Sequence, residues 1–96
     1  MRLITLERQD SAEIITLARP DRRNALSLEI MLALVEALGV IETDDTVRSV
    51  IIAAEGKVFC SGHDLSQMTR RTEADYRHIF NVCTQLMLKL QRIPQP

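Results

Sequence analysis

Two short runs near the amino terminus are rich in residues that favour β-strands. Residues 2–8 and 13–18 consist largely of Ile, Leu and Thr, and the polar residues 9–11 separate them. Two such runs joined by a short polar turn predict a β-hairpin. Pro20 is expected to end the second strand, because proline lacks an N–H and biases the residue before it toward extended geometry.

A helical pattern follows this hairpin. Ser27 is a suitable N-cap, and Glu29 lies where a negative charge favours the first turn. Apolar residues then recur at helical spacing and predict a buried stripe, formed by Met31, Leu34, Val35, Leu38 and Ile41. The polar residues 42–45 end the predicted helix and lead into a strand that starts near Val47.

The unbroken apolar run Val50–Ala54 is typical of a strand covered on both faces. It leads directly into Lys57–Leu65, K-V-F-C-S-G-H-D-L, where Ser61 and Gly62 keep side-chain bulk low and Asp64 can cap the turn that follows. Backbone N–H groups in such a turn, and at a helix N-terminus, lack intrahelical partners. The segment predicts a backbone cradle for a carbonyl oxygen or an anion; the alternative is a tight connection that uses the backbone freedom of glycine.

A second helix is predicted after this segment. Thr72–Asp75 resembles a capping box. Its apolar stripe comprises Tyr76, Ile79, Phe80, Cys83, Leu86, Met87 and Leu90, and Pro94 and Pro96 stop it. The order β-β-α-β-turn-α predicts an α/β fold with the turn at the carboxyl end of a central strand, the end at which open α/β folds place ligands.

Composition narrows the class of protein. A chain of 96 residues allows one domain, and 46% hydrophobic with 26% charged residues is ordinary for a soluble globular protein. A net charge of −1 and the absence of long basic runs argue against a nucleic-acid partner. The longest apolar run, Ile30–Val35, is too short to span a bilayer, so no membrane partner is expected.

The cysteines and the amino terminus bear on the compartment. Cys60 and Cys83 are isolated and lack metal-ligand spacing, so we expect reduced thiols, no metal site, and Cys83 as part of the core. Strand-like sequence begins directly after Met1, without the apolar region of a signal peptide. We therefore expect a cytoplasmic protein.

Two motifs in this order resemble a known family. Arg19–Leu26, R-P-D-R-R-N-A-L, is followed by F-C-S-G-H-D-L at residues 59–65, and the pair resembles the N-terminal part of the crotonase superfamily, the enoyl-CoA hydratase/isomerase family of acyl-CoA enzymes. The resemblance implies an α/β fold of the ClpP/crotonase type, a β-β-α spiral. Residues 1–96 would be the incomplete N-terminal portion of a single crotonase-like domain. A full-length protein would be a homo-oligomer, either a trimer or a dimer of trimers.

The resemblance also implies an oxyanion hole, in which two backbone N–H groups hold the thioester carbonyl of an acyl-CoA. The first donor would be the N–H of His63, the residue after the glycine of F-C-S-G. A prealigned donor stabilises the charge on an enolate oxygen, and its loss typically costs roughly 3 kcal/mol in the barrier. The family often has alanine at this position, so a role of the imidazole in acid/base catalysis is left open beside the backbone role.

Further residues are expected to contact coenzyme A, which enters as part of the substrate and not as a separate cofactor. Arg22 and Arg23 would face its phosphates, with Arg23 the stronger candidate, since guanidinium groups bind phosphate bidentately; the alternative is a solvated basic loop. Asn24 would fix the loop through side-chain-to-backbone bonds. Ala25 would lie near the adenine. The remaining candidates are Ser61, Gly62, His63, Asp64 and Leu65, and for Asp64 the alternative is a structural cap.

The full enzyme is thus expected to hydrate or isomerise an enoyl-CoA in fatty acid metabolism, by oxyanion stabilisation and carboxylate acid/base catalysis. The second oxyanion donor and the acid/base residues of the family have no match up to Pro96, so the isolated chain is expected to be inactive. The alternatives are another crotonase reaction, such as thioester hydrolysis, or a non-catalytic acyl-CoA-binding or assembly subunit. The predicted helices carry more apolar surface than one hairpin covers, which favours association.

Overall fold

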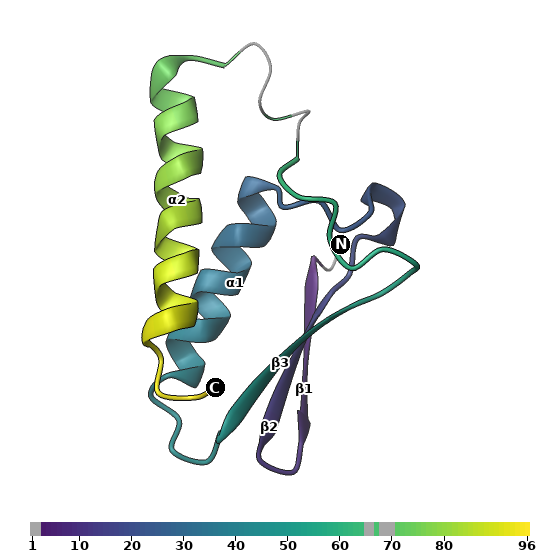
Figure 1. Cartoon of the computed structure of the whole chain (residues 1–96), viewed down its shortest axis with the longest axis vertical. Coiled ribbons are helices and arrows are strands. Elements are labelled where there is room, and N and C mark those ends of the chain that lie inside the picture. The colour runs from purple at the N-terminus through teal and green to yellow at the C-terminus, as the bar shows by residue number, and fades with distance from the viewer. Residues whose placement is uncertain (1–2, 65–66, 68–70) are drawn as a thin grey trace.

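A computed structural model describes residues 3–64, 67 and 71–96 of the chain. These residues form β1 (Ile4–Gln9), β2 (Ala12–Leu17), the 3-10 helix η1 (Pro20–Arg22), α1 (Leu28–Ile41), β3 (Ser49–Ala54) and α2 (Glu73–Arg92) (Figure 1). This order confirms the predicted β-β-α-β-α arrangement, with strand ends shifted by one or two residues. None of the helices in the described part of the chain is long and apolar enough to cross a membrane.

The three strands form one sheet in the order β1-β2-β3. β1 and β2 are antiparallel, with Gln9 opposite Ala12, and Asp10 in the connecting turn has a φ of 54°. β2 and β3 are parallel, and α1 is the crossover between them. The carboxyl ends of β2 and β3 therefore lie at the same end of the sheet, where η1 and the segment after β3 also lie (Figure 1).

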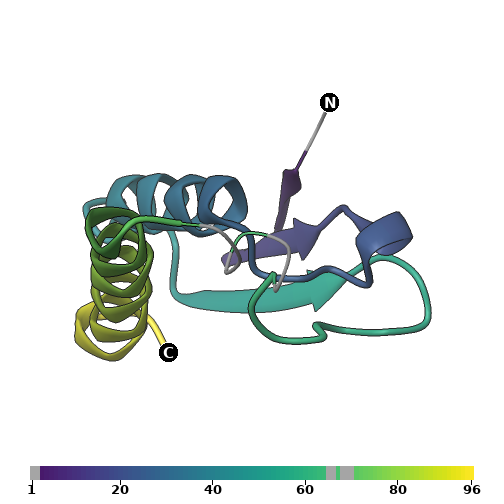
Figure 2. The same cartoon turned by 90° about the horizontal axis from the view of Figure 1, so that it is seen from above.

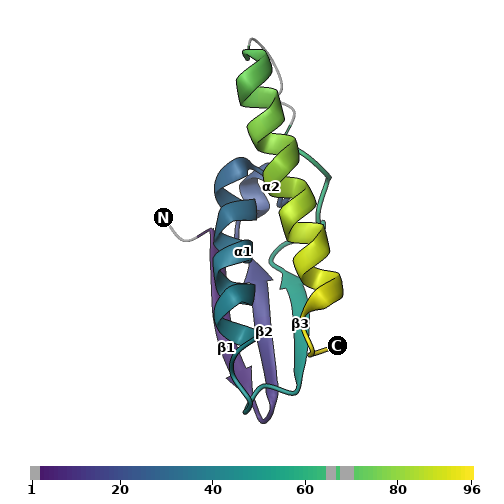
Figure 3. The ribbon, with the colours of Figure 1, turned by 90° about the vertical axis from the view of Figure 1, so that its left-hand side faces the viewer.

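The prediction that β3 is a central strand covered on both faces is wrong for this chain. β3 lies at the edge of the three-stranded sheet, and its Ile51 is 49% exposed. Both helices lie in front of the same face of the sheet (Figure 3), which leaves the opposite face of β3 open. At the outer edge of β3, the Val50 N–H donates to the carbonyl oxygen of Pro96 at 2.8 Å.

The core lies between this sheet and the two helices (Figure 2). Ser27 caps α1 as predicted, because its hydroxyl accepts a hydrogen bond from the Ile30 N–H at 3.2 Å. The predicted stripe of α1 is buried except for Val35, which is half-buried. The buried apolar side chains are Ile15, Leu17, Ile30, Met31, Leu34, Ala37, Leu38, Ile41, Val47, Ile79, Val82, Leu86 and Ile93. Each of the larger ones contributes about 1.5–3 kcal/mol by leaving water.

α2 begins with the predicted capping box, in which Thr72 and Asp75 bond reciprocally at 3.1 and 3.2 Å. Its apolar stripe is narrower than predicted. Phe80, Met87 and Leu90 are 49%, 43% and 36% exposed, and Cys83, expected in the core, is half-buried. Phe80 belongs to the amino-terminal half of α2, which extends beyond α1 and the sheet (Figure 1), whereas Met87 and Leu90 belong to the carboxyl-terminal half and are exposed there as well.

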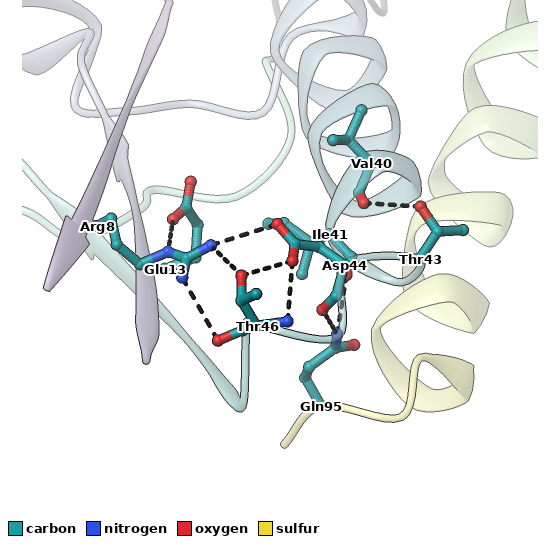
Figure 4. Close-up of polar contacts among 8 residues, drawn as sticks. All are labelled: Arg8, Glu13, Val40, Ile41, Thr43, Asp44, Thr46 and Gln95. Atoms are coloured by element: carbon teal, nitrogen blue, oxygen red, sulfur yellow. Dashed lines mark hydrogen bonds and ion pairs between the residues drawn. The ribbon is translucent and has the colours of Figure 1, made fainter. Parts of the chain in front are cut away.

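A polar cluster fixes the connection between α1 and β3 (Figure 4). The guanidinium of Arg8 donates to Glu13 at 3.1 Å, to Asp44 at 3.3 Å and to the Thr46 hydroxyl at 3.1 Å. A hydrogen bond from the Thr46 side chain is the main cause that lowers the pKa of Asp44. Gln95 adds a bond from its Nε2 to the Asp44 carbonyl at 3.4 Å. These contacts join β1, the end of α1 and the carboxyl-terminal segment.

Candidate functional site

Two segments that are far apart in the sequence meet beyond the carboxyl ends of β2 and β3. Leu26 and His63 form an isolated parallel bridge. The Leu26 N–H donates to the Gly62 carbonyl at 2.7 Å, and the Asp64 N–H donates to the Leu26 carbonyl at 3.1 Å. Leu26 is therefore bonded to both chain neighbours of His63. In a parallel bridge of this kind, the residue between the two bonded neighbours directs its own N–H to the opposite side. The His63 N–H accordingly points away from Leu26, and it donates to no acceptor within the described part of the chain.

Two backbone N–H groups in the turn before His63 have hydrogen-bond acceptors. The Ser61 N–H donates to the Arg23 carbonyl at 3.1 Å, and the Gly62 N–H donates to the Cys60 sulfur at 3.4 Å. Gly62 has a φ of 99°, so the turn does use the backbone freedom of glycine that the alternative interpretation invoked, and a Cβ there would meet no atom within 4 Å. The surroundings of Gly62 thus leave room for a ligand to approach the main chain.

The imidazole of His63 lies against α2. Its Nε2 is 3.7 Å from the sulfur of Cys83, and the ring packs edge-on against Phe80 with centroids 6.3 Å apart and an interplanar angle of 76°. Its Nδ1 is buried without a hydrogen-bond partner among the described residues. The side chain and the N–H of His63 therefore have separate surroundings, which explains how the site accommodates a residue larger than alanine.

Asn24 organises the loop before α1, as predicted. It is completely buried, and its Oδ1 accepts a hydrogen bond from the Arg19 N–H at 2.9 Å. Its Nδ2 donates to the carbonyls of Glu55 and Val58, both at 2.8 Å. Asn24 and Arg23 have φ values of 54° and 55°, a conformation that asparagine tolerates well. One side chain thus joins the loop of residues 19–26 to the segment that follows β3.

A cavity of about 260 Å³ lies beside these two segments. Among the predicted contact residues, Arg22, Ala25 and Asp64 line it. Arg23 and Ser61 are exposed and lie outside the described lining. Leu65 lies outside the described residues, and so does the start of the turn that Asp64 was expected to cap. The Gln67 N–H donates to the Asp64 carbonyl at 3.0 Å.

Arg19 is a cavity residue that the sequence analysis missed. Its guanidinium pairs with Asp21 at 3.3 Å, and this hydrogen bond is the main cause that lowers the pKa of Asp21. With Arg22 it gives the cavity two guanidinium groups, which suit phosphate or carboxylate ligands. Its sequence signal was its place at the start of the R-P-D-R-R-N-A-L motif.

Gln67 is the second residue that was missed. Its Oε1 accepts a hydrogen bond from the Leu28 N–H at 2.8 Å, and its Nε2 donates to the Glu29 carboxylate at 2.9 Å. The bond from Gln67, followed by one from the backbone of Glu29 itself, lowers the pKa of the Glu29 carboxyl. Gln67 and Leu28 are separated by 39 residues, so no local pattern could have indicated their contact.

The cavity lining combines the guanidinium groups of Arg19 and Arg22 with the carboxylates of Glu29 and Asp64. The guanidinium groups can bind an anionic group, and the His63 N–H, outside this lining, can donate a hydrogen bond to a carbonyl oxygen. Among the described residues, no group of three or more His, Cys, Asp or Glu is placed to hold a metal ion.

Known proteins resemble this chain over nearly its whole length. A family model described as enoyl-CoA hydratase/isomerase matches residues 7–96. Enoyl-CoA hydratase domain-containing protein 3 of Rattus norvegicus, whose name adds mitochondrial, is 39% identical over 97 residues, which cover 99% of this chain and 32% of the relative. The trans-2-decenoyl-acyl-carrier-protein isomerase of Streptococcus mutans is 34% identical over 86 residues, covering 85% of this chain and 33% of the relative.

The structural likeness agrees with these matches. The crystal structure of an enoyl-CoA hydratase from Mycobacterium smegmatis superposes with a TM-score of 0.95 at 41% identity, covering 100% of this chain and 38% of that protein. The three strands and two helices are therefore an N-terminal part of the crotonase fold. This chain spans about a third of the length of the curated relatives it matches. It belongs to the enoyl-CoA hydratase/isomerase family, within the crotonase superfamily.

Proposed function

We propose that the protein containing this chain binds an enoyl-CoA thioester and hydrates or isomerises it, with the His63 N–H as the first oxyanion donor. The observation that carries the proposal is the Leu26–His63 bridge, which turns this N–H away from the backbone partner of its segment. The names of the matched relatives include both a hydratase and an isomerase. Both reactions pass through a state with negative charge on the thioester oxygen.

The proposed chemistry requires the N–H to be in place before the charge develops. A prealigned donor needs no reorganisation during the reaction, and removing one typically costs roughly 3 kcal/mol in the barrier. The hydrogen bonds at Ser61, Gly62 and Asp64 restrain the backbone on both sides of His63. The second donor and the carboxylate acid and base are expected from parts of the protein outside residues 1–96.

Part of coenzyme A would lie in the cavity beside the loop of residues 19–26. Arg22, together with Arg19, would neutralise its phosphates from the cavity wall, while Arg23 stays a predicted contact at the exposed side of the loop. Ala25 would lie near the adenine, Asp64 lines the same cavity, and Ser61 and Leu65 stay predicted contacts along the CoA and pantetheine path. CoA is the carrier portion of the substrate in this proposal.

The imidazole of His63 is not given a proton-transfer role. It packs against Cys83 and Phe80 of α2, and its Nδ1 is buried without a hydrogen-bond partner among the described residues. This favours the backbone over the side chain as the functional part of His63.

The test compares crotonyl-CoA hydration, and the isomerisation of a 3-enoyl-CoA, by the full-length protein and by Gly62→Pro. Proline fixes φ near −65°, whereas Gly62 has 99°, so the substitution reorients the peptide that carries the His63 N–H. We expect kcat to fall on the order of 100-fold or more. Gly39→Ala, on α1, is the control and should retain activity. Equal rates for Gly62→Pro and the parent protein would refute the oxyanion assignment.

Two further expectations belong to this proposal. The whole protein should be a homo-oligomer, a trimer or a dimer of trimers, which light scattering after size-exclusion chromatography tests. A cytoplasmic location is tested by cell fractionation, with a mitochondrial location as the contrary result.

A further inference from the structure

We propose that Gln67 is a positioning residue for the proposed reaction. Its side-chain amide accepts a hydrogen bond from Leu28 and donates one to Glu29, and it thereby links the neighbourhood of the His63 N–H to the first turn of α1. The inference rests on the proposed function for its activity readout. Its structural part, the dependence of the segment on this amide, can be tested without a substrate.

The two hydrogen bonds require an amide in one orientation. The Leu28 N–H lies in the first turn of α1, where backbone donors lack partners within the helix, so its acceptor must come from outside. The ionised Glu29 carboxylate can only accept, so it needs a donor. A glutamine at position 67 meets both requirements at 2.8 and 2.9 Å, whereas a carboxylate there meets only the first.

The position of Gln67 explains why its loss would reach His63. Residues 62–64 are bound to Leu26 by the bridge, and the Gln67 N–H donates to the Asp64 carbonyl at 3.0 Å while the Gln67 side chain contacts the start of α1. Without the side-chain bonds of Gln67, the peptide that presents the His63 N–H keeps its bridge to Leu26 but loses this link to the first turn of α1. A small displacement of an oxyanion donor is expected to reduce kcat more than it changes KM.

The charges around Glu29 determine how a carboxylate at position 67 would behave. The Gln67 amide and the Ser27 side chain favour the ionised form and lower the pKa of Glu29, while the charge of Asp64 opposes them. Arg19 and Arg22 line the same cavity and add positive charge. Glu29 is therefore ionised at neutral pH, and a second carboxylate beside it would be repelled.

The experiment exchanges donor and acceptor in the full-length protein. In Gln67→Glu, the carboxylate of Glu29 and the new carboxylate at position 67 repel each other at about pH 8, and we expect kcat to fall roughly 2- to 10-fold. Near about pH 5 the pair can share a proton, and kcat should recover in part. In the double variant Glu29→Gln/Gln67→Glu, the amide introduced at position 29 can donate to the carboxylate at position 67. We expect this exchange to restore kcat to within about 2-fold at both pH values.

Amide hydrogen exchange supplies the second readout. Residues 61–64 should exchange faster in Gln67→Glu than in the parent and return to parental rates in the double variant. Gln91→Glu makes the same chemical change on the exposed surface of α2 and should alter neither readout. If the parent lacks enoyl-CoA activity but the exchange pattern holds, the proposed function fails while the positioning role stands. Unchanged exchange and kcat in Gln67→Glu, or no rescue in the double variant, would overturn the inference.

Discussion

Asn24 shows how one side chain can hold the two site segments together. It is completely buried, and it satisfies one N–H and two carbonyl groups with hydrogen bonds of 2.8–2.9 Å. All three partners belong to loops, which have no ladder of backbone bonds to replace them. The R-R-N-A-L sequence alone indicated a loop-fixing role, but the carbonyls of Glu55 and Val58 became apparent only in the folded chain.

Replacing Asn24 should therefore destabilise the protein more than an exposed asparagine does. In Asn24→Ala three buried groups lose their partner, and we expect a loss of roughly 2–4 kcal/mol in the free energy of unfolding. Urea denaturation measures the change, and Asn81→Ala on the exposed side of α2 serves as the control, expected within about 0.5 kcal/mol of the parent. A similar stability for the two variants would contradict the role assigned to Asn24.

Glu29 should contribute to the pH dependence of stability. Its pKa lies below the usual 4.5, chiefly because Gln67 donates to the ionised form. A depressed folded-state pKa means that the contribution is fully present above the unfolded pKa and is lost as pH falls through the folded one. The stability difference between the parent and Glu29→Gln, measured by urea denaturation at several pH values, should therefore shrink on acidification below about pH 4.5. A difference that grows with acid would have the wrong sign.

At the scale of elements, the turn after β3 depends on its contact with η1. Gly56 has a φ of 85°, and a Cβ at this position would lie 2.8 Å from the Cβ of Pro20. The close approach brings the segment that leads to His63 against the loop that carries the arginines. Glycine is required here by both conformation and space, whereas Gly39 on α1 has neither restriction: a Cβ there would meet the Lys89 side chain at an ordinary 3.7 Å.

The two glycines make a matched pair for mutation. Gly56→Ala should lower the free energy of unfolding by roughly 1–3 kcal/mol, since it combines an unfavourable φ with a steric clash. Gly39→Ala should be neutral or stabilising by up to about 1 kcal/mol, because alanine has the higher helix propensity. Thermal unfolding followed by circular dichroism compares them. A more stable Gly56→Ala would show that the turn and η1 are not tightly packed.

At the scale of the whole molecule, residues 1–96 expose an apolar surface that the elements in this chain do not cover. Phe80, Met87 and Leu90 protrude from α2, and Ile51 and Leu6 from the sheet. Exposed apolar groups of this extent favour association. The chain also spans only about a third of the length of its curated relatives.

We accordingly expect the isolated 96-residue polypeptide to self-associate as its concentration rises. We also expect it to hydrate crotonyl-CoA no faster than its own Gly62→Pro variant, because one oxyanion donor without an acid and a base stabilises charge but moves no proton. Light scattering over a dilution series and an enoyl-CoA assay test the two parts. A monodisperse, active 96-residue chain would contradict the proposal that the remaining groups lie outside these residues.

The sequence by itself determined the features that depend on neighbours a few residues away. The hairpin turn, the Ser27 cap, the capping box at Thr72 and the buried stripe of α1 follow from local spacing and hydrogen bonding, and the structure confirms them. The two loop motifs also indicated the crotonase family, which the comparisons confirm. Local chemistry is sufficient for such features because the partners are held together by the chain itself.

Tertiary structure alone decided how the site is assembled. The Leu26–His63 bridge and the Gln67 bonds to the start of α1 join segments more than 35 residues apart, and these contacts orient the His63 N–H. Tertiary structure also placed β3 at a sheet edge, against the prediction of a strand covered on both faces, and decided which part of the apolar face of α2 is exposed. Hydrophobic spacing indicates which residues favour burial, but the packing of distant elements decides which of them find a partner.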